Sequence, residues 1–226
     1  MKTTAARAAA LMTLALAACD APEQAEKAAT PASTEAHTTM DGPFAASEKS
    51  MDTAMKAAVG IDAADTWVRK MIAHHAGAIE MSRVVLGVNP TADVVRMAQM
   101  TIDNQGAENE VLRGLIREGA PNPASAKLYE ASEMEMHEGM MAANGATPSE
   151  AYLTKMLAHH KGAVTMSDIA LANGATGAVR AQIEETRAEQ VAEVEMVEAM
   201  LRGELMPAGM GHASGSAKAG HEMGGM

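Results

Sequence analysis

Apolar positions in this chain recur every three to four residues over six segments, the spacing of one face of an α-helix. In each half the pattern predicts a short helix, a helix that carries two adjacent histidines, and a longer third helix. The expected ranges are about 45–58, 63–87 and 90–118 in the first half, and about 125–143, 148–172 and 176–203 in the second. Ala, Met, Leu and Glu dominate these segments, so an all-α fold is expected.

Helix boundaries are marked by capping and turn residues. Thr147-Pro148-Ser149-Glu150 has the order of an N-cap, an N1 proline and an acidic N3 residue. Asp62 and Asp65 form a weaker version of the same signal in the first half. Stops are expected at Asn89-Pro90, Asn144-Gly145 and Asn173-Gly174.

The two halves are copies of one unit, because residue n matches residue n + 85 without a gap. Residues 71–81 read MIAHHAGAIEM and residues 156–166 read MLAHHKGAVTM. Repeat 1 is assigned to 45–118 and repeat 2 to 119–203. Short connections make sequence neighbours antiparallel, so we expect the four long helices to form one bundle with the short helices docked on it. Two separate smaller bundles are the alternative.

The ends of the chain differ from the helical part. Residues 1–18 have a positive start and a short apolar run, as in a secretory signal peptide. They end in Leu-Ala-Ala before Cys19, the only cysteine, which resembles a bacterial lipobox and implies a lipid anchor in the cell envelope, facing the periplasm; an ordinary signal peptide is the alternative. Residues 19–44 are predicted to be a flexible tether and residues 204–226 a disordered tail rich in Met and His.

Net charge restricts the partners. The chain carries a formal charge of −11 at pH 7, which argues against nucleic acid and against anionic lipid headgroups as partners. We therefore expect contact with the membrane only through the lipid.

Histidines and methionines form the candidate metal site. At helical spacing, Met71, His74 and Met81 share one apolar stripe, with His75 beside it, and the second copy repeats this arrangement. Met71 and Met81 are too far apart to bind one ion together with His74, so each copy needs ligands from a second helix. The candidate ligands are Met71, His74, His75, Met81, Met156, His159, His160 and Met166, with Met51, Met55, Met136, His137 and Met140 on the short helices and Met210, His212, His221 and Met223 in the tail.

A polar group in the middle of the third helix is the expected support for these histidines. Gln105 and Glu108 in repeat 1, and Gln190 and Glu193 in repeat 2, lie on an otherwise apolar stripe. Buried Gln and Glu need partners, and an imidazole N–H from the neighbouring helix would serve. A buried polar network without a metal would give the same pattern.

Ligand softness selects the metal. The chain has 21 methionines in 226 residues, and several lie in the tail, where no core needs filling. Thioether and imidazole ligands favour Cu(I) and, by softness, Ag(I). A di-iron site is disfavoured, since no Glu-x-x-His occurs, and a metal-free interaction module of the envelope remains an alternative. No nucleophile–base set, phosphate loop or cysteine pair occurs, so catalysis has no positive support.

The His-His-x-Gly-Ala-x-x-Met segment and the later Gln-x-x-Glu resemble domain-of-unknown-function family 305 over about 45–203. The resemblance implies a ferritin-like helical bundle and, for CopM-like periplasmic copper-binding members, metal binding through His74, His75, His159, His160 and nearby methionines. Lys161 and Thr165 stand where the first copy has Ala76 and Glu80, so the two copies differ beside their histidines. A copper-handling partner protein and a homo-oligomer both remain open.

Overall fold

The helices of this computed structural model, which describes residues 42–206, follow the two-copy pattern. They are α1 (Ala45–Ala57), α2 (Ala63–Leu86), α3 (Ala92–Gly114), α4 (Pro123–Lys127), α5 (Glu130–Ala142), α6 (Pro148–Ala172) and α7 (Gly177–Leu201). No strand occurs in this part of the chain, so the all-α prediction is confirmed. None of the helices within 42–206 is long and apolar enough to cross a bilayer.

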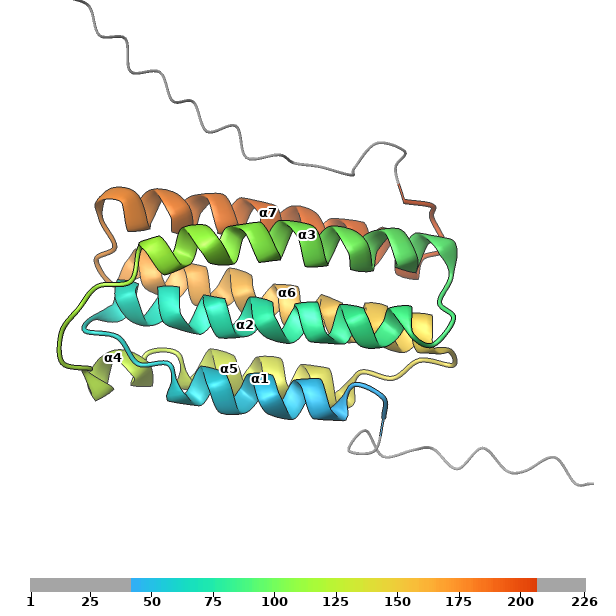
Figure 1. The fold of residues 1–226 in the computed structure, drawn as a ribbon, viewed down its shortest axis with the longest axis horizontal. Coiled ribbons are helices and arrows are strands. Elements are labelled where there is room, and N and C mark those ends of the chain that lie inside the picture. The colour runs from blue at the N-terminus through green and yellow to red at the C-terminus, as the bar shows by residue number, and fades with distance from the viewer. Residues whose placement is uncertain (1–41, 207–226) are drawn as a thin grey trace, which may run out of the picture. The chain divides into compact units, whose positions relative to one another are not determined.

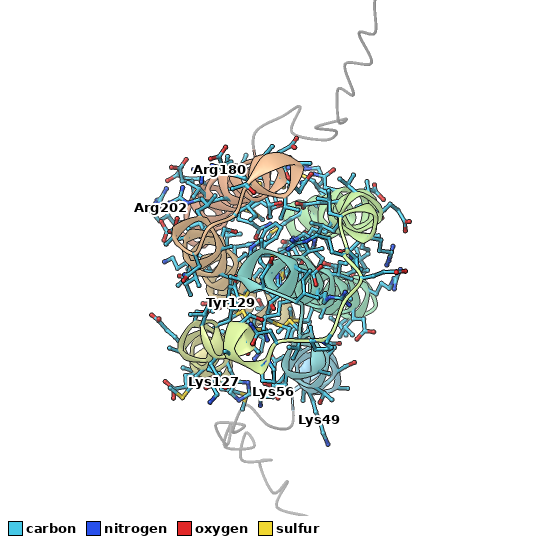
Figure 2. All side chains as sticks on the ribbon, turned by 90° about the vertical axis from the view of Figure 1, so that its left-hand side faces the viewer. Lys49, Lys56, Lys127, Tyr129, Arg180 and Arg202 are labelled. Carbon is cyan, nitrogen blue, oxygen red and sulfur yellow. The ribbon has the colours of Figure 1, made fainter. Side chains whose placement is uncertain are left out.

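The helices lie in three layers, with α2 and α6 in the middle (Figure 1). Helix α3 packs on α2 and α7 packs on α6, on one side of that middle layer. Helices α1 and α5 lie on the other side, where α1 contacts α2 and α5 contacts α6. In the view along the helices, Arg180 of α7 and Lys49 of α1 mark the two outer faces (Figure 2). Because α2 also contacts α6, the two copies form one bundle.

The predicted caps form as expected at both paired-histidine helices. The Asp62 side chain accepts from the Asp65 backbone N–H at 3.0 Å, and Thr147 accepts from the Glu150 N–H at 3.2 Å. At the end of α6, Gly174 adopts φ +88°, a left-handed conformation that suits glycine.

Two expected helix boundaries are wrong, each for a packing reason. The helix expected at 125–143 is broken between α4 and α5, where the buried Tyr129 donates to the Ala63 carbonyl at 2.7 Å. The third helix of repeat 1 ends at Gly114 rather than near 118, because the Arg117 backbone N–H donates to Asp65 instead, at 2.8 Å.

The core also reaches further than the expected tether and tail allow. Phe44, assigned to the tether, is buried and lies 6.1 Å from the Tyr152 ring. Met206, assigned to the tail, is buried in the same core. Cys19 and the candidate ligands Met210, His212, His221 and Met223 lie outside the described residues.

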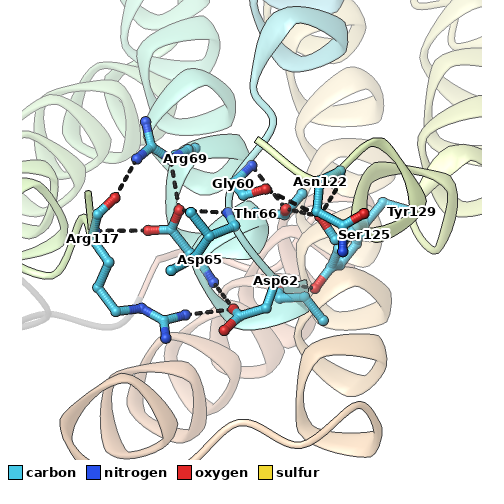
Figure 3. A network of polar contacts seen from close by, with 11 residues as sticks. Gly60, Asp62, Asp65, Thr66, Arg69, Arg117, Asn122, Ser125 and Tyr129 are labelled. Atoms are coloured by element: carbon cyan, nitrogen blue, oxygen red, sulfur yellow. Dashed lines mark hydrogen bonds and ion pairs between the residues drawn. The ribbon is translucent and has the colours of Figure 1, made fainter. Parts of the chain in front are cut away.

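The segment that connects the two repeats is held to the start of α2 by hydrogen bonds (Figure 3). Asp65 is fully buried and accepts from the Ile61 and Arg117 backbone N–H groups and from the Arg69 side chain. Nearby, Thr66 and Ser125 hydroxyls lie 2.6 Å apart. A buried carboxylate needs this number of donors, so the corner has a structural role.

Candidate metal centre

The four histidines lie at the centre of the bundle, where α2 and α6 meet, and none is exposed to solvent. The His74 and His159 rings stack, with centroids 3.5 Å apart and planes inclined by 26°. Each ring Nε2 lies 3.1 Å from the backbone carbonyl oxygen of the other histidine. The contact is reciprocal, as the duplication requires, and it joins the two repeats.

These contacts fix the tautomer of the stacked pair. A carbonyl oxygen only accepts, so Nε2 of His74 and of His159 carries the proton. The lone pair of each ring is therefore on Nδ1, and neither Nδ1 has a hydrogen-bond partner among residues 42–206. A buried polar atom without a partner costs about 1–3 kcal/mol. Two such lone pairs in the middle of the bundle are available to a metal ion.

The second histidine of each pair points toward the third helix. His160 Nδ1 lies 2.7 Å from Gln190 Oε1 and 3.2 Å from Glu193 Oε2, and Gln190 Nε2 donates to Glu193 at 2.8 Å. His160 therefore donates through Nδ1, which leaves its Nε2 as the lone pair, again without a partner in the described part. Gln190 and Glu193 are thus the polar groups that contact this imidazole.

The polar contacts around the second histidine of the pair are weaker in repeat 1 than in repeat 2. His75 Nε2 is 3.6 Å from Glu108 Oε2, too long for a hydrogen bond. Glu108 instead receives the Thr186 hydroxyl and, at 3.3 Å, the Gln182 amide, both from α7 of the other repeat. Gln105 is buried on α3 as expected. The two copies therefore hold their histidines differently, although the residue types match.

Burial determines the charge of this cluster. It lowers the pKa of His75 to about 3 and of His160 to about 4, and holds the pKa values of His74 and His159 well below 6.5. All four rings are therefore neutral at pH 7, which is the form that binds metals. Burial also raises the pKa values of Glu108 and Glu193 to about 7.

The flanking methionines have a different environment. Met71, Met81, Met156 and Met166 are at most 1% exposed and belong to the continuous apolar core. Their thioethers are packed among other apolar side chains, as is usual for methionine in a core.

The short-helix candidates come together, which the chain pattern alone does not show. Met51 and Met55 of α1, and Met136, His137 and Met140 of α5, line one cavity of about 10 Å³ between these helices. This volume suits a single water molecule or ion. Glu48, Asp52, Glu133 and Met141 complete its lining. The soft donors of the two repeats thus converge, instead of serving one site in each copy.

Two recurring glycines make room for this arrangement. A Cβ on Gly77 would lie 2.4 Å from the Met51 sulfur, and a Cβ on Gly162 would lie 2.5 Å from the Met136 sulfur. A glycine within a helix costs about 1 kcal/mol relative to alanine. Both glycines therefore allow the close approach of a neighbouring side chain, which is a methionine in both repeats.

A family model described as domain of unknown function (DUF305) matches residues 1–116, 117–201 and 149–226. The chain belongs to this family. The first match contains the first paired-histidine segment, and the other two contain the second. No curated protein and no solved structure matches the chain. Within 42–206 of this DUF305 chain, no three His, Cys, Asp or Glu side chains are grouped so that they could hold a metal ion.

Sequence reasoning missed four charged residues of this DUF305 fold. Lys70 pairs with Glu133 and Lys155 pairs with Glu48, both at 2.5 Å and both between the repeats. Each lysine also donates to a carbonyl of a short helix, Lys70 to Met55 and Lys155 to Met140, at 2.8 Å. The available signal was their recurrence at n + 85 on a face otherwise apolar.

Proposed function

We propose that this protein binds Cu(I), and by the same chemistry Ag(I), in copper homeostasis or resistance. The observation that carries the proposal is a set of buried, neutral imidazoles, each with a ring nitrogen that has no hydrogen-bond partner within residues 42–206, in the layer next to a methionine-lined cavity. Imidazole and thioether donors together favour soft monovalent copper over hard divalent ions.

The roles of the ligands follow from their environment. Three of the four histidines have an assigned lone pair, on Nδ1 of His74 and His159 and on Nε2 of His160, and these are the nitrogens proposed to bind. Gln190 and Glu193 orient His160, whereas Glu108 lies near His75 without a hydrogen bond to it. Sequestration and delivery to a copper-handling partner are both consistent with this chemistry.

The test is a Cu(I) titration of the mature protein against a competing chelator. Replacing His74, His75, His159 and His160 by alanine should lower the Cu(I) affinity, because the nitrogen donors are lost. Leu112→Ala is the matched control, since it also empties space in the buried core without removing a donor. Equal affinity in the quadruple variant would assign the histidines to a structural network. A wild-type protein without Cu(I) affinity would favour the metal-free interaction module.

Export is proposed together with the metal. Copper(I) sites of thioether and imidazole suit an oxidising compartment, where thiols are lost to disulfides. Cys19→Ser should release the protein from the membrane fraction or leave the precursor uncleaved. Unchanged processing and membrane association would refute the lipid anchor.

A further inference from the structure

The two repeats contribute equivalent methionines to the cavity between α1 and α5. Met51 and Met136 are equivalent in the two repeats, as are Met55 and Met140. Within each helix the two methionines are four residues apart, so they lie on one face. All four are 2–6% exposed and line the same cavity. Four thioethers from two helices therefore surround one small space.

The glycines argue against a packing role for these methionines. Each repeat has a glycine in its paired-histidine helix, and each glycine admits one methionine sulfur of this cavity. A core that needed only apolar volume could use alanine there with a smaller neighbour, and the helix would be more stable. Both copies instead keep the glycine and the thioether together.

The charges around the cavity suit a monovalent ion. Thioethers are neutral, and the three carboxylates of the lining are already paired with lysines: Glu48 with Lys155, Glu133 with Lys70 and Asp52 with Lys56. These carboxylates are therefore not free to neutralise the charge of an ion in the cavity. The cost of burying a charge rises with its square, so a divalent ion costs about four times as much as a monovalent one.

We infer that the two repeats share one thioether site for a soft monovalent cation, formed by Met51, Met55, Met136 and Met140. This inference rests on the proposed function and adds where one ion binds and how many repeats it needs. The site is distinct from the histidine cluster in its ligands.

The rim of the site is asymmetric and favours entry beside α5. Where repeat 1 has Asp52 and Lys56, which pair with each other at 2.8 Å, repeat 2 has His137 and Met141. His137 is exposed, and Met134, one turn earlier, is 61% exposed. These accessible soft donors of α5 would receive the ion first and pass it to the buried thioethers.

The test counts Cu(I) ions by native mass spectrometry of the mature full-length protein. One variant carries Met51→Leu and Met55→Leu, a second carries Met136→Leu and Met140→Leu, and a third carries all four changes. Leucine keeps the volume, so the fold should persist. A double change of Met97 and Met100 to Leu on α3 is the matched control, because these methionines do not line the cavity.

A shared site predicts that each pair variant loses one Cu(I) and that the fourfold variant loses no more than one. If each pair loses one ion and the fourfold variant loses two, each repeat has its own site and the inference is wrong. If Cu(I) binds equally to all variants, the inference is wrong while the proposed function stands. If the wild-type protein binds no Cu(I), the proposed function fails and the inference fails with it.

Methyl NMR of the unmodified protein covers the case in which a variant does not fold. With labelled methionine methyl groups, one equivalent of Ag(I) should shift the four cavity methionines together and leave Met97 unchanged. A shift confined to the methionines of one repeat would overturn the shared site.

Discussion

Lys155 is the best position at which to perturb the contact between the two repeats, because it pairs with a residue of repeat 1. Its ammonium group pairs with Glu48 of α1 and donates to the Met140 carbonyl at the end of α5. The Lys155 and Glu48 side chains are each only 6% exposed. Lys155→Met keeps the length of the side chain and removes both interactions.

The expected cost is large because the partners stay buried. Glu48 keeps its charge without a counterion, and the Met140 carbonyl loses a donor. Removing one partner of a buried ion pair costs about 3–5 kcal/mol. For a folded unit of this size that corresponds to a fall in Tm of roughly 6–20 °C. Adding Glu48→Gln should restore part of the loss, since the uncompensated charge disappears.

Urea unfolding and thermal melting followed by circular dichroism measure this effect. Lys161→Met is the matched control on the same helix, because the Lys161–Glu198 pair is exposed at 55% and 41%. The control should leave Tm nearly unchanged, as is usual for surface pairs. If Lys155→Met and Lys161→Met have equal effects, the buried pair does not stabilise the contact between the two repeats and the reasoning is refuted.

Three further results are expected. Gly77→Ala should displace Met51 and lower both stability and Cu(I) affinity, whereas Gly106→Ala, which has nothing within 4 Å of the added Cβ, should be neutral or stabilising. Burial raises the pKa of Glu108 to about 7, so the folded protein keeps a proton that the unfolded chain releases. Stability should therefore fall as the pH rises from about 4.5 to about 7 and level off above that, and Glu108→Gln should reduce this fall in urea unfolding; an unchanged pH profile would contradict it. Deleting residues 207–226 should lower the number of Cu(I) ions bound without changing helix content, and an unchanged count would contradict the role of the tail.

Local signals predicted the helices well, because each depends on nearby residues. The Thr147 and Asp62 caps, the Gly174 stop and the n + 85 match all describe interactions within one turn or one repeat. The boundaries failed where a distant group competes. Tyr129 interrupts a helix because it reaches Ala63, and the chain near Arg117 leaves the helix because it reaches Asp65.

The candidate site was predicted by residue type but not by arrangement. Periodicity placed His74 and His159 on inward faces, yet their stacking depends on how two distant helices cross. The convergence of Met51 with Met136 depends on the packing of α1 and α5 on a middle layer made by both repeats. A pattern within one helix carries no information on that packing, so one site for each copy was the natural expectation.

The most direct test of metal binding by this fold is anomalous diffraction from crystals grown with Cu(I), collected at the copper edge. We predict peaks inside the bundle, at the cavity between α1 and α5 and beside the free ring nitrogens of His74 and His159. Loaded protein that shows no peak among residues 42–206 would contradict the claim that the paired-histidine bundle is the copper site.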